Sequence, residues 1–171
     1  MFMNNKNDII NNTFDDFCAI VPTQIREYIA ATKDVLQCKE YHPEVWVYDH
    51  IRIVFNRAKR TKDINLMVAA IFHDLGKVTT TERDPISGKW TSKLHEKFSV
   101  DIVEQHRNWI ESIGANFEIV LFIVKQHMRA KKMDEMRKHK RMVLMEDPYY
   151  PYVEKFTELD DMKIDYSNDI D

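Results

Sequence analysis

The segment from Asp63 to Lys77 constrains the fold of this chain more than any other part of it. Its side chains from Leu66 to Phe72 are almost all apolar, so a helix formed here must be buried on most sides. The segment then places an imidazole and a carboxylate side by side, at His73 and Asp74. Burying such groups without partners is costly, and a metal ion bound by both would offset that cost. The segment therefore predicts a buried helix that ends at a metal site.

Residues that break helices are scarce in the rest of the chain. The 171 residues include only three glycines and five prolines, which favours helices over a β fold with many turns. The length suits one domain with a single hydrophobic core. We therefore expect an all-α, single-domain fold, with residues 1–44 as an N-terminal extension whose helix packs on the core of residues 45–171.

Charge and cysteine content exclude some classes of protein. The net charge of −3 argues against nucleic-acid binding through overall charge, although a local basic run could still bind it. Cys18 and Cys38 lack the spacing of a metal site and are expected to be reduced thiols. No apolar run approaches the ~20 residues of a membrane span, and the first residues lack a signal-peptide core. We expect a soluble, cytoplasmic protein that does not contact a membrane.

Apolar residues recur at helical spacing in several segments. In the segment over residues 45–58, His50 shares an apolar stripe with Val47, Ile51 and Val54, so its ring should face inward. Gly76 is expected to end the helix that carries His73. A turn-rich stretch with a short hairpin from Asp84 to Trp90 should precede His95. The predicted helices cover residues 21–36, 45–58, 63–73, 95–110, 117–127 and 152–162.

Four histidines fall on the inward face or at the end of four different predicted helices. They are His50, His73, His95 and His127. Two acidic positions share this property: Asp74, and either Asp160 or Asp161. One buried histidine is more often a structural residue than a ligand, but four of them beside a His-Asp pair indicate a shared metal site. The remaining histidines, in loops or on mixed faces, are assigned no role: His42, His106 and His139.

This constellation resembles the HD-domain superfamily of metal-dependent phosphohydrolases, in which a His, a His-Asp pair and a distal Asp follow one another. The resemblance runs from about Trp46 to Asp165 and implies a helical HD phosphohydrolase domain over residues 45–171. Within the superfamily the chain looks most like the HD domains associated with tRNA nucleotidyltransferases. The matching motifs are His50, His73-Asp74-Leu75-Gly76-Lys77 with Thr80, His95-Glu96, His127, and the run 156–161.

The distal acid is implied by its spacing from apolar residues. Family members place it after apolar residues three and three apart, and Val153, Phe156 and Leu159 supply that spacing before Asp160. Asp161 and Asp165 are the alternatives, although Asp165 would need charged residues at core positions. A solvated helix end at residues 160–161 is the other interpretation.

The resemblance implies one or two divalent transition-metal ions. The first would be held by His50, His73, Asp74 and Asp160, and His95 and His127 would complete a second site that Asp74 bridges. The resemblance allows Fe, Mn, Zn, Ni or Co, with Mg as an alternative. In nucleotidyltransferase-type domains the third histidine, here His95, can contact phosphate instead.

The implied reaction is hydrolysis of a phosphomonoester or phosphodiester by metal-activated hydroxide. The expected substrate is a phosphorylated small molecule or nucleotide, or the end of an RNA or DNA strand. Asp74 and Lys77 are the expected catalytic residues, with Lys77 at the site mouth as a phosphate anchor. Lys77 could instead only offset a helix dipole. Arg129, Lys131 and Lys132 either bind substrate or form a solvated face.

Two functions from other classes also fit the residues. A di-iron oxygenase of the myo-inositol oxygenase-like branch would use the same six ligands to cleave a carbon bond with dioxygen. A non-catalytic HD binding module would keep the fold alone. The sequence indicates neither the substrate nor the oligomeric state.

Overall fold

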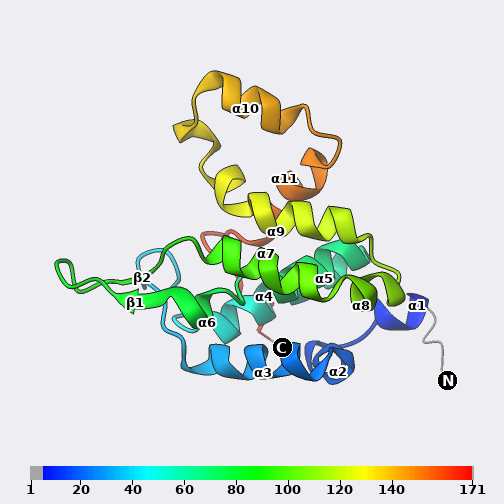
Figure 1. Cartoon of the computed structure of the whole chain (residues 1–171). Coiled ribbons are helices and arrows are strands. Elements are labelled where there is room, and N and C mark those ends of the chain that lie inside the picture. Colours follow the sequence, from blue (N-terminus) through cyan, green and yellow to red (C-terminus); the bar gives the residue numbers. More distant parts are fainter. Residues whose placement is uncertain (1–5, 171) are drawn as a thin grey trace.

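Helices form most of the regular structure in the computed structural model, which describes residues 6–170 (Figure 1). The expected all-α fold is confirmed. The α-helices are α1 (Lys6–Ile9), α2 (Phe14–Ile20), α3 (Thr23–Ala31), α4 (Val47–Arg60), α5 (Ile64–Phe72), α6 (Lys77–Thr80), α7 (His95–Gln105), α8 (Arg107–Ser112), α9 (Phe117–Lys131), α10 (Lys138–Met145) and α11 (Tyr150–Leu159). Two 3-10 helices, η1 (Thr32–Asp34) and η2 (Met133–Glu135), and two strands, β1 (Thr81–Arg83) and β2 (Trp90–Ser92), complete them.

The apolar helix α5 lies at the centre of the molecule. All of its side chains except Asn65 are buried, and Asp63 caps its first turn by accepting a hydrogen bond from the Asn65 N–H. Helix α4 packs against one side of α5, and α9 contacts α5 while lying against both α7 and α11. This arrangement brings the C-terminal ends of α5 and α11 and the N-terminal end of α7 to the N-terminal part of α4 and to the C-terminal part of α9.

Helices α2 and α3 cover the side of α4 that faces away from α9 (Figure 1). Phe14 and Phe17 of α2 pack edge-on or tilted against Phe55, with ring centroids 5.5 and 5.1 Å apart. Sequence analysis missed α2, although Thr13 and Asp16 form the capping box that starts it. The predicted helix over residues 21–36 is shorter in the structure, where α3 and η1 together span residues 23–34.

Gly76 does not end a helix in the way that the sequence suggested. Its φ is −61°, an ordinary helical value, and it precedes α6. A Cβ at this position would lie only 2.1 Å from the His95 carbonyl oxygen, and the Gly76 N–H donates to Ser99 Oγ. The glycine is needed because the backbone of α7 approaches here too closely for any side chain.

The predicted hairpin is present between α6 and α7. Strands β1 and β2 pair antiparallel with Arg83 opposite Trp90, and Asp84 in the turn accepts a hydrogen bond from the Ser87 N–H. The hairpin extends from one end of the helical body (Figure 1). It also places Ser92 just before the first residue of α7.

One further prediction is wrong, and one further helix was missed. The single helix expected over residues 95–110 is divided at His106, where φ is −117° and the ring donates to the Ile102 carbonyl. Helix α10 was not predicted, because the basic run that contains it lacks a continuous apolar stripe. Figure 1 shows α10 set apart from the body, beyond α9, and only Leu144 of this helix is buried.

Within residues 6–170, none of the helices has the length and apolar character needed to cross a membrane.

Arg57 fastens the C-terminal segment to α4. Its buried guanidinium donates to the carbonyls of Leu159, Asp161 and Ile164 and to the Asp169 carboxylate, at 2.7 to 3.1 Å. These bonds hold the backbone on both sides of Asp160. The position of Asp160 therefore depends on a cation that lies about two turns after His50 in the same helix.

Candidate metal centre

The structure brings the six predicted ligands into one buried cluster. His50 comes from the N-terminal part of α4, His73 and Asp74 from the turn after α5, and His95 from the start of α7. His127 comes from the last turns of α9, and Asp160 follows α11 directly. All six are at most 3% exposed. Groups with this chemistry are stable at such depth only when they are paired or bind a cation.

Hydrogen bonds at Nδ1 set the tautomer of all four histidines. The Nδ1 atoms of His73, His95 and His127 lie 2.8 to 2.9 Å from the carbonyl oxygens of Ala70, Ser92 and Val124. The Nδ1 atom of His50 lies 2.7 Å from Glu44 Oε1. Because these partners can only accept, Nδ1 carries the proton and Nε2 of each neutral ring keeps its lone pair.

The four Nε2 atoms point toward one another in two pairs. His50 Nε2 lies 3.3 Å from His73 Nε2, and His95 Nε2 lies 3.4 Å from His127 Nε2. Two facing lone pairs repel, whereas a cation bound to both would be attracted to them. Imidazole nitrogens with carboxylate oxygens form a donor set for iron, manganese or zinc. The residues therefore fit the metal that the sequence predicted.

Asp74 lies between the two histidine pairs. Its Oδ2 is 3.4 Å from His50 Nε2 and 3.3 Å from His73 Nε2, while its Oδ1 is 3.0 Å from His95 Nε2 and 3.9 Å from His127 Nε2. One carboxylate thus presents a separate oxygen to each pair. This is the geometry expected of a carboxylate that bridges two ions.

The two pairs define two halves of the cluster. We call His50, His73 and Asp160 the His50 half, and His95 and His127 the His95 half; Asp74 belongs to both. Asp160 Oδ1 lies 2.8 Å from His50 Nε2 and 3.7 Å from His73 Nε2. Neither oxygen of Asp160 has an aligned hydrogen-bond donor among the described residues, although both are buried. An ion in the His50 half would satisfy the oxygen that faces the two rings.

Two lysines lie against the carboxylates. Lys77 Nζ is 2.8 Å from Asp74 Oδ2, and Lys131 Nζ is 2.5 Å from Asp160 Oδ2. Burial opposes ionisation of both aspartates, but interactions with His73 and with the Lys77 ammonium hold the pKa of Asp74 well below its usual range. Lys131 is the main group that lowers the pKa of Asp160 in the same way. Both carboxylates are therefore ionised and ready to bind a cation.

The halves differ in their electrostatics. Burial lowers the pKa of His50, but Asp160 and Glu44 outweigh it and leave that pKa above the ordinary value. Burial lowers the pKa of His127 to about 3, and the interaction with His73 acts in the same direction. The His50 half therefore attracts positive charge more strongly than the His95 half does.

The other predicted site residues lie at different distances from the cluster. Lys77 is buried rather than at the mouth, and it donates to Gln37 as well as contacting Asp74. Lys132 is exposed where α9 ends. The alternative acids lie outside: Asp161 accepts a hydrogen bond from the Lys163 N–H, and exposed Asp165 accepts one from the Ser167 N–H.

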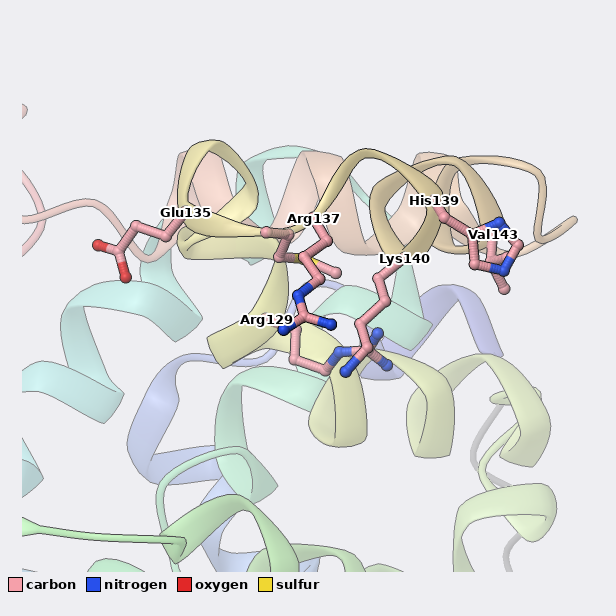
Figure 2. Close-up of a pocket in the computed structure, with 7 residues that line it drawn as sticks. Arg129, Glu135, Arg137, His139, Lys140 and Val143 are labelled. Atoms are coloured by element: carbon pink, nitrogen blue, oxygen red, sulfur yellow. The ribbon is translucent and has the colours of Figure 1, made fainter.

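Arg129 faces away from the cluster. A helix turns about 200° over two residues, so Arg129 leaves the face that carries His127. Its guanidinium donates to Gln126 and lines an open hollow of about 880 Å³ between α9 and α10. Figure 2 shows Arg129, Arg137 and Lys140 converging in this hollow, while the carboxylate of Glu135, which also lines it, points away from them. His139 also lines the hollow.

Sequence analysis missed the groups that surround the cluster on the side of α4. Glu44, which contacts His50, lies in the loop before α4, and the same carboxylate oxygen lies 2.9 Å from His42 Nδ1. This loop has no apolar periodicity to show which way its side chains point. The only signal was an acidic residue between Pro43 and Val45, shortly before a predicted ligand helix.

Comparison with known families agrees with this geometry. The family model described as HD domain matches residues 45–162, so the chain belongs to the HD-domain family. Members of this family are typically metal-dependent phosphohydrolases. Comparisons with curated proteins and with solved structures gave no significant match. The matched region contains all six clustered ligands and begins just after Glu44.

Proposed function

We propose that this protein is a phosphohydrolase that uses two metal ions to hydrolyse the phosphoester of a nucleotide or of a nucleic-acid end. The observation that carries the proposal is Asp74, whose two oxygens face two separate histidine pairs. His50, His73, Asp74 and Asp160 would hold one ion, and Asp74, His95 and His127 the other. The second ion would have only three protein ligands, which leaves coordination positions free for water and substrate.

The chain's own cations support phosphoryl chemistry. When bound, two such ions supply Lewis-acid activation of water and of a phosphoryl oxygen. Lys131 has a side chain that is 28% exposed and forms an ion pair with Asp160, and its long aliphatic stem would let the ammonium turn from that carboxylate toward an incoming phosphate. Lys77 is held between Asp74 and Gln37 and balances the charge of the bridging carboxylate. A redox reaction with dioxygen has no evident need for these two ammonium groups.

The hollow beside α10 favours a substrate with more than one phosphate. Seven basic and three acidic residues lie between Arg129 and Glu146, whereas the whole chain carries 25 basic and 28 acidic residues. Arg129, Arg137 and Lys140 meet in the hollow (Figure 2). Backbone phosphates of a strand whose end reaches the metal centre could bind here. An oligonucleotide should then show steeper salt dependence of kcat/KM than a mononucleotide with the same terminal group.

Metal analysis combined with a phosphatase screen tests the proposal. The purified protein should contain close to two equivalents of transition metal and release phosphate or nitrophenol from mononucleotides, cyclic nucleotides or bis(p-nitrophenyl) phosphate. The Asp74→Ala variant should lose both metal and activity, while Asp161→Ala, a change outside the cluster, should keep both. Retention of both by Asp74→Ala would show that the proposal is wrong. Iron-dependent oxygen uptake without phosphatase activity would favour the oxygenase, and metal binding without either activity would favour a binding module.

A further inference from the structure

The loop before α4 reaches the metal centre from outside the family-matched region. This loop, residues 35–47, is closed at its base by an antiparallel bridge between Leu36 and Trp46 and by a Gln37 N–H to Val45 carbonyl bond of 2.8 Å. Closure sets Gln37 and Glu44 side by side, with 3.4 Å between Gln37 Nε2 and Glu44 Oε1. Both side chains point inward: Gln37 is 4% exposed, and the Glu44 side chain is 2% exposed.

The Glu44 carboxylate contacts His50 on the side opposite to the cluster. Its Oε1 accepts the Nδ1 protons of both His50 and His42, at 2.7 and 2.9 Å. His42 also packs edge-on against the His50 ring, with centroids 4.9 Å apart. The orientation and the tautomer of the His50 ring are therefore set by this loop.

Among the four ligand histidines, His50 is the one whose Nδ1 donates its hydrogen bond to an anion. The other three donate to backbone carbonyls, which no substitution can remove. A carboxylate behind an imidazole raises its basicity and strengthens its bond to a metal. Glu44 therefore acts on one half of the cluster and not on the other.

Two unfavourable features of the loop indicate a role beyond folding. Val45 has a φ of 72°, a left-handed conformation that β-branched residues rarely adopt. Glu44 Oε2 is buried without a hydrogen-bond partner among the described residues. Both features lie where the backbone turns Glu44 inward, so the fold tolerates them in order to place this carboxylate.

We propose that Glu44 is a positioning residue that orients His50 and sets the affinity of the ion in the His50 half. The inference rests on the proposed metal centre and extends it to a residue outside the HD-domain match. The loop also contacts the cluster at a second point, because Gln37 Oε1 accepts a 2.6 Å hydrogen bond from the Lys77 ammonium, which in turn contacts Asp74. One closed loop thus supports both His50 and the lysine on the bridging carboxylate.

Titration of the metal-free full-length protein with Co²⁺ tests the proposal, because its visible absorption reports the ligand set of each bound ion. Wild type should bind two ions. Glu44→Ala should weaken one of them by about 10- to 100-fold, the usual effect of losing such an outer partner, and leave the other unchanged. Glu44→Gln keeps an acceptor without the charge and should fall between Glu44→Ala and wild type.

Glu40→Ala is the matched control, since it removes an exposed carboxylate of the same loop that pairs with Lys89. It should bind both ions as wild type does. Circular dichroism of each variant checks folding, and the near-isosteric Glu44→Gln keeps the test valid if Glu44→Ala does not fold. Equal Co²⁺ affinities in Glu44→Gln and wild type, or equal weakening of both ions, would overturn this inference alone. A wild-type protein that binds no Co²⁺ would overturn the metal centre itself and this inference with it.

Discussion

The two halves of the cluster use the same imidazole chemistry in different surroundings. In the His50 half, Asp160 faces the rings and Glu44 lies behind His50. In the His95 half, the shared Asp74 is the one carboxylate among the described residues within 4 Å of the ligand Nε2 atoms, and Glu96 lies 3.9 Å from His95 Nδ1. The difference suggests a division of tasks, in which the His50 half holds its ion firmly and the His95 half leaves its ion open to substrate. Carboxylate placement, more than histidine number, separates the two sites.

Removing the shared carboxylate should abolish metal binding in both halves, because neither half has a complete ligand set without it. We expect Asp74→Asn to lose both ions and to reduce kcat/KM by more than the 10- to 100-fold typical of an outer-shell change. Metal content measured by mass spectrometry after gel filtration is the appropriate readout. Asp161→Asn, which changes an adjacent acid outside the cluster, should retain both ions. One ion remaining in Asp74→Asn would mean that Asp74 does not bridge.

Single histidine changes should separate the halves. His127→Gln should bind one ion tightly and lose most activity, because the open half is the one expected to receive substrate. His50→Gln should weaken the other ion but keep some binding through Asp160 and His73. Co²⁺ titrations of the two variants, with His139→Gln as an exposed control, measure both effects. The same residual affinity in both variants would remove the proposed asymmetry.

The hydrogen bonds by which Arg57 holds the C-terminal segment should affect metal binding in the His50 half only. Arg57→Met leaves the Asp169 carboxylate buried without one of its cations and frees the backbone around Asp160. Loss of one partner from a buried pair lowers the free energy of unfolding by about 3 to 5 kcal/mol. Urea unfolding measures this loss, and metal titration should show weaker binding in the His50 half alone. Arg52→Met, which removes a half-exposed pair with Asp49 on the same helix, is the control.

The smallest expected effect concerns Lys131. Lys131→Met should raise the KM for a phosphate ester by about tenfold, which corresponds to about 1.4 kcal/mol. It should also leave the affinity of the His50 half unchanged or slightly tighter, because the ammonium no longer competes for Asp160 Oδ2. Steady-state kinetics and Co²⁺ titration report the two effects separately. A large loss of metal would instead give Lys131 a structural role.

The six clustered residues could be predicted because each lies at a fixed point of a helical pattern. His50 shares a stripe with core residues, and His73 and Asp74 follow a helix that must be buried. Glu44 could not be predicted in this way. The direction of its side chain depends on a loop that is closed by contacts between residues about ten positions apart, and no periodic pattern of apolar residues marks that loop. The sequence also concealed the division at His106, because the apolar period continues through the break. Helix α2 was visible in principle, through the pairing of Thr13 with Asp16.

Gly76 connects the fold to the relation between the two halves. Because the backbone there lies against the first residue of α7, the separation between His73 and His95 is set by main chain resting on main chain. A methyl group at this position would push α7 outward and carry His95 away from Asp74. The spacing of the proposed two-ion centre is thus determined by one absent side chain, and ligand substitutions should alter which ions bind while leaving that spacing intact.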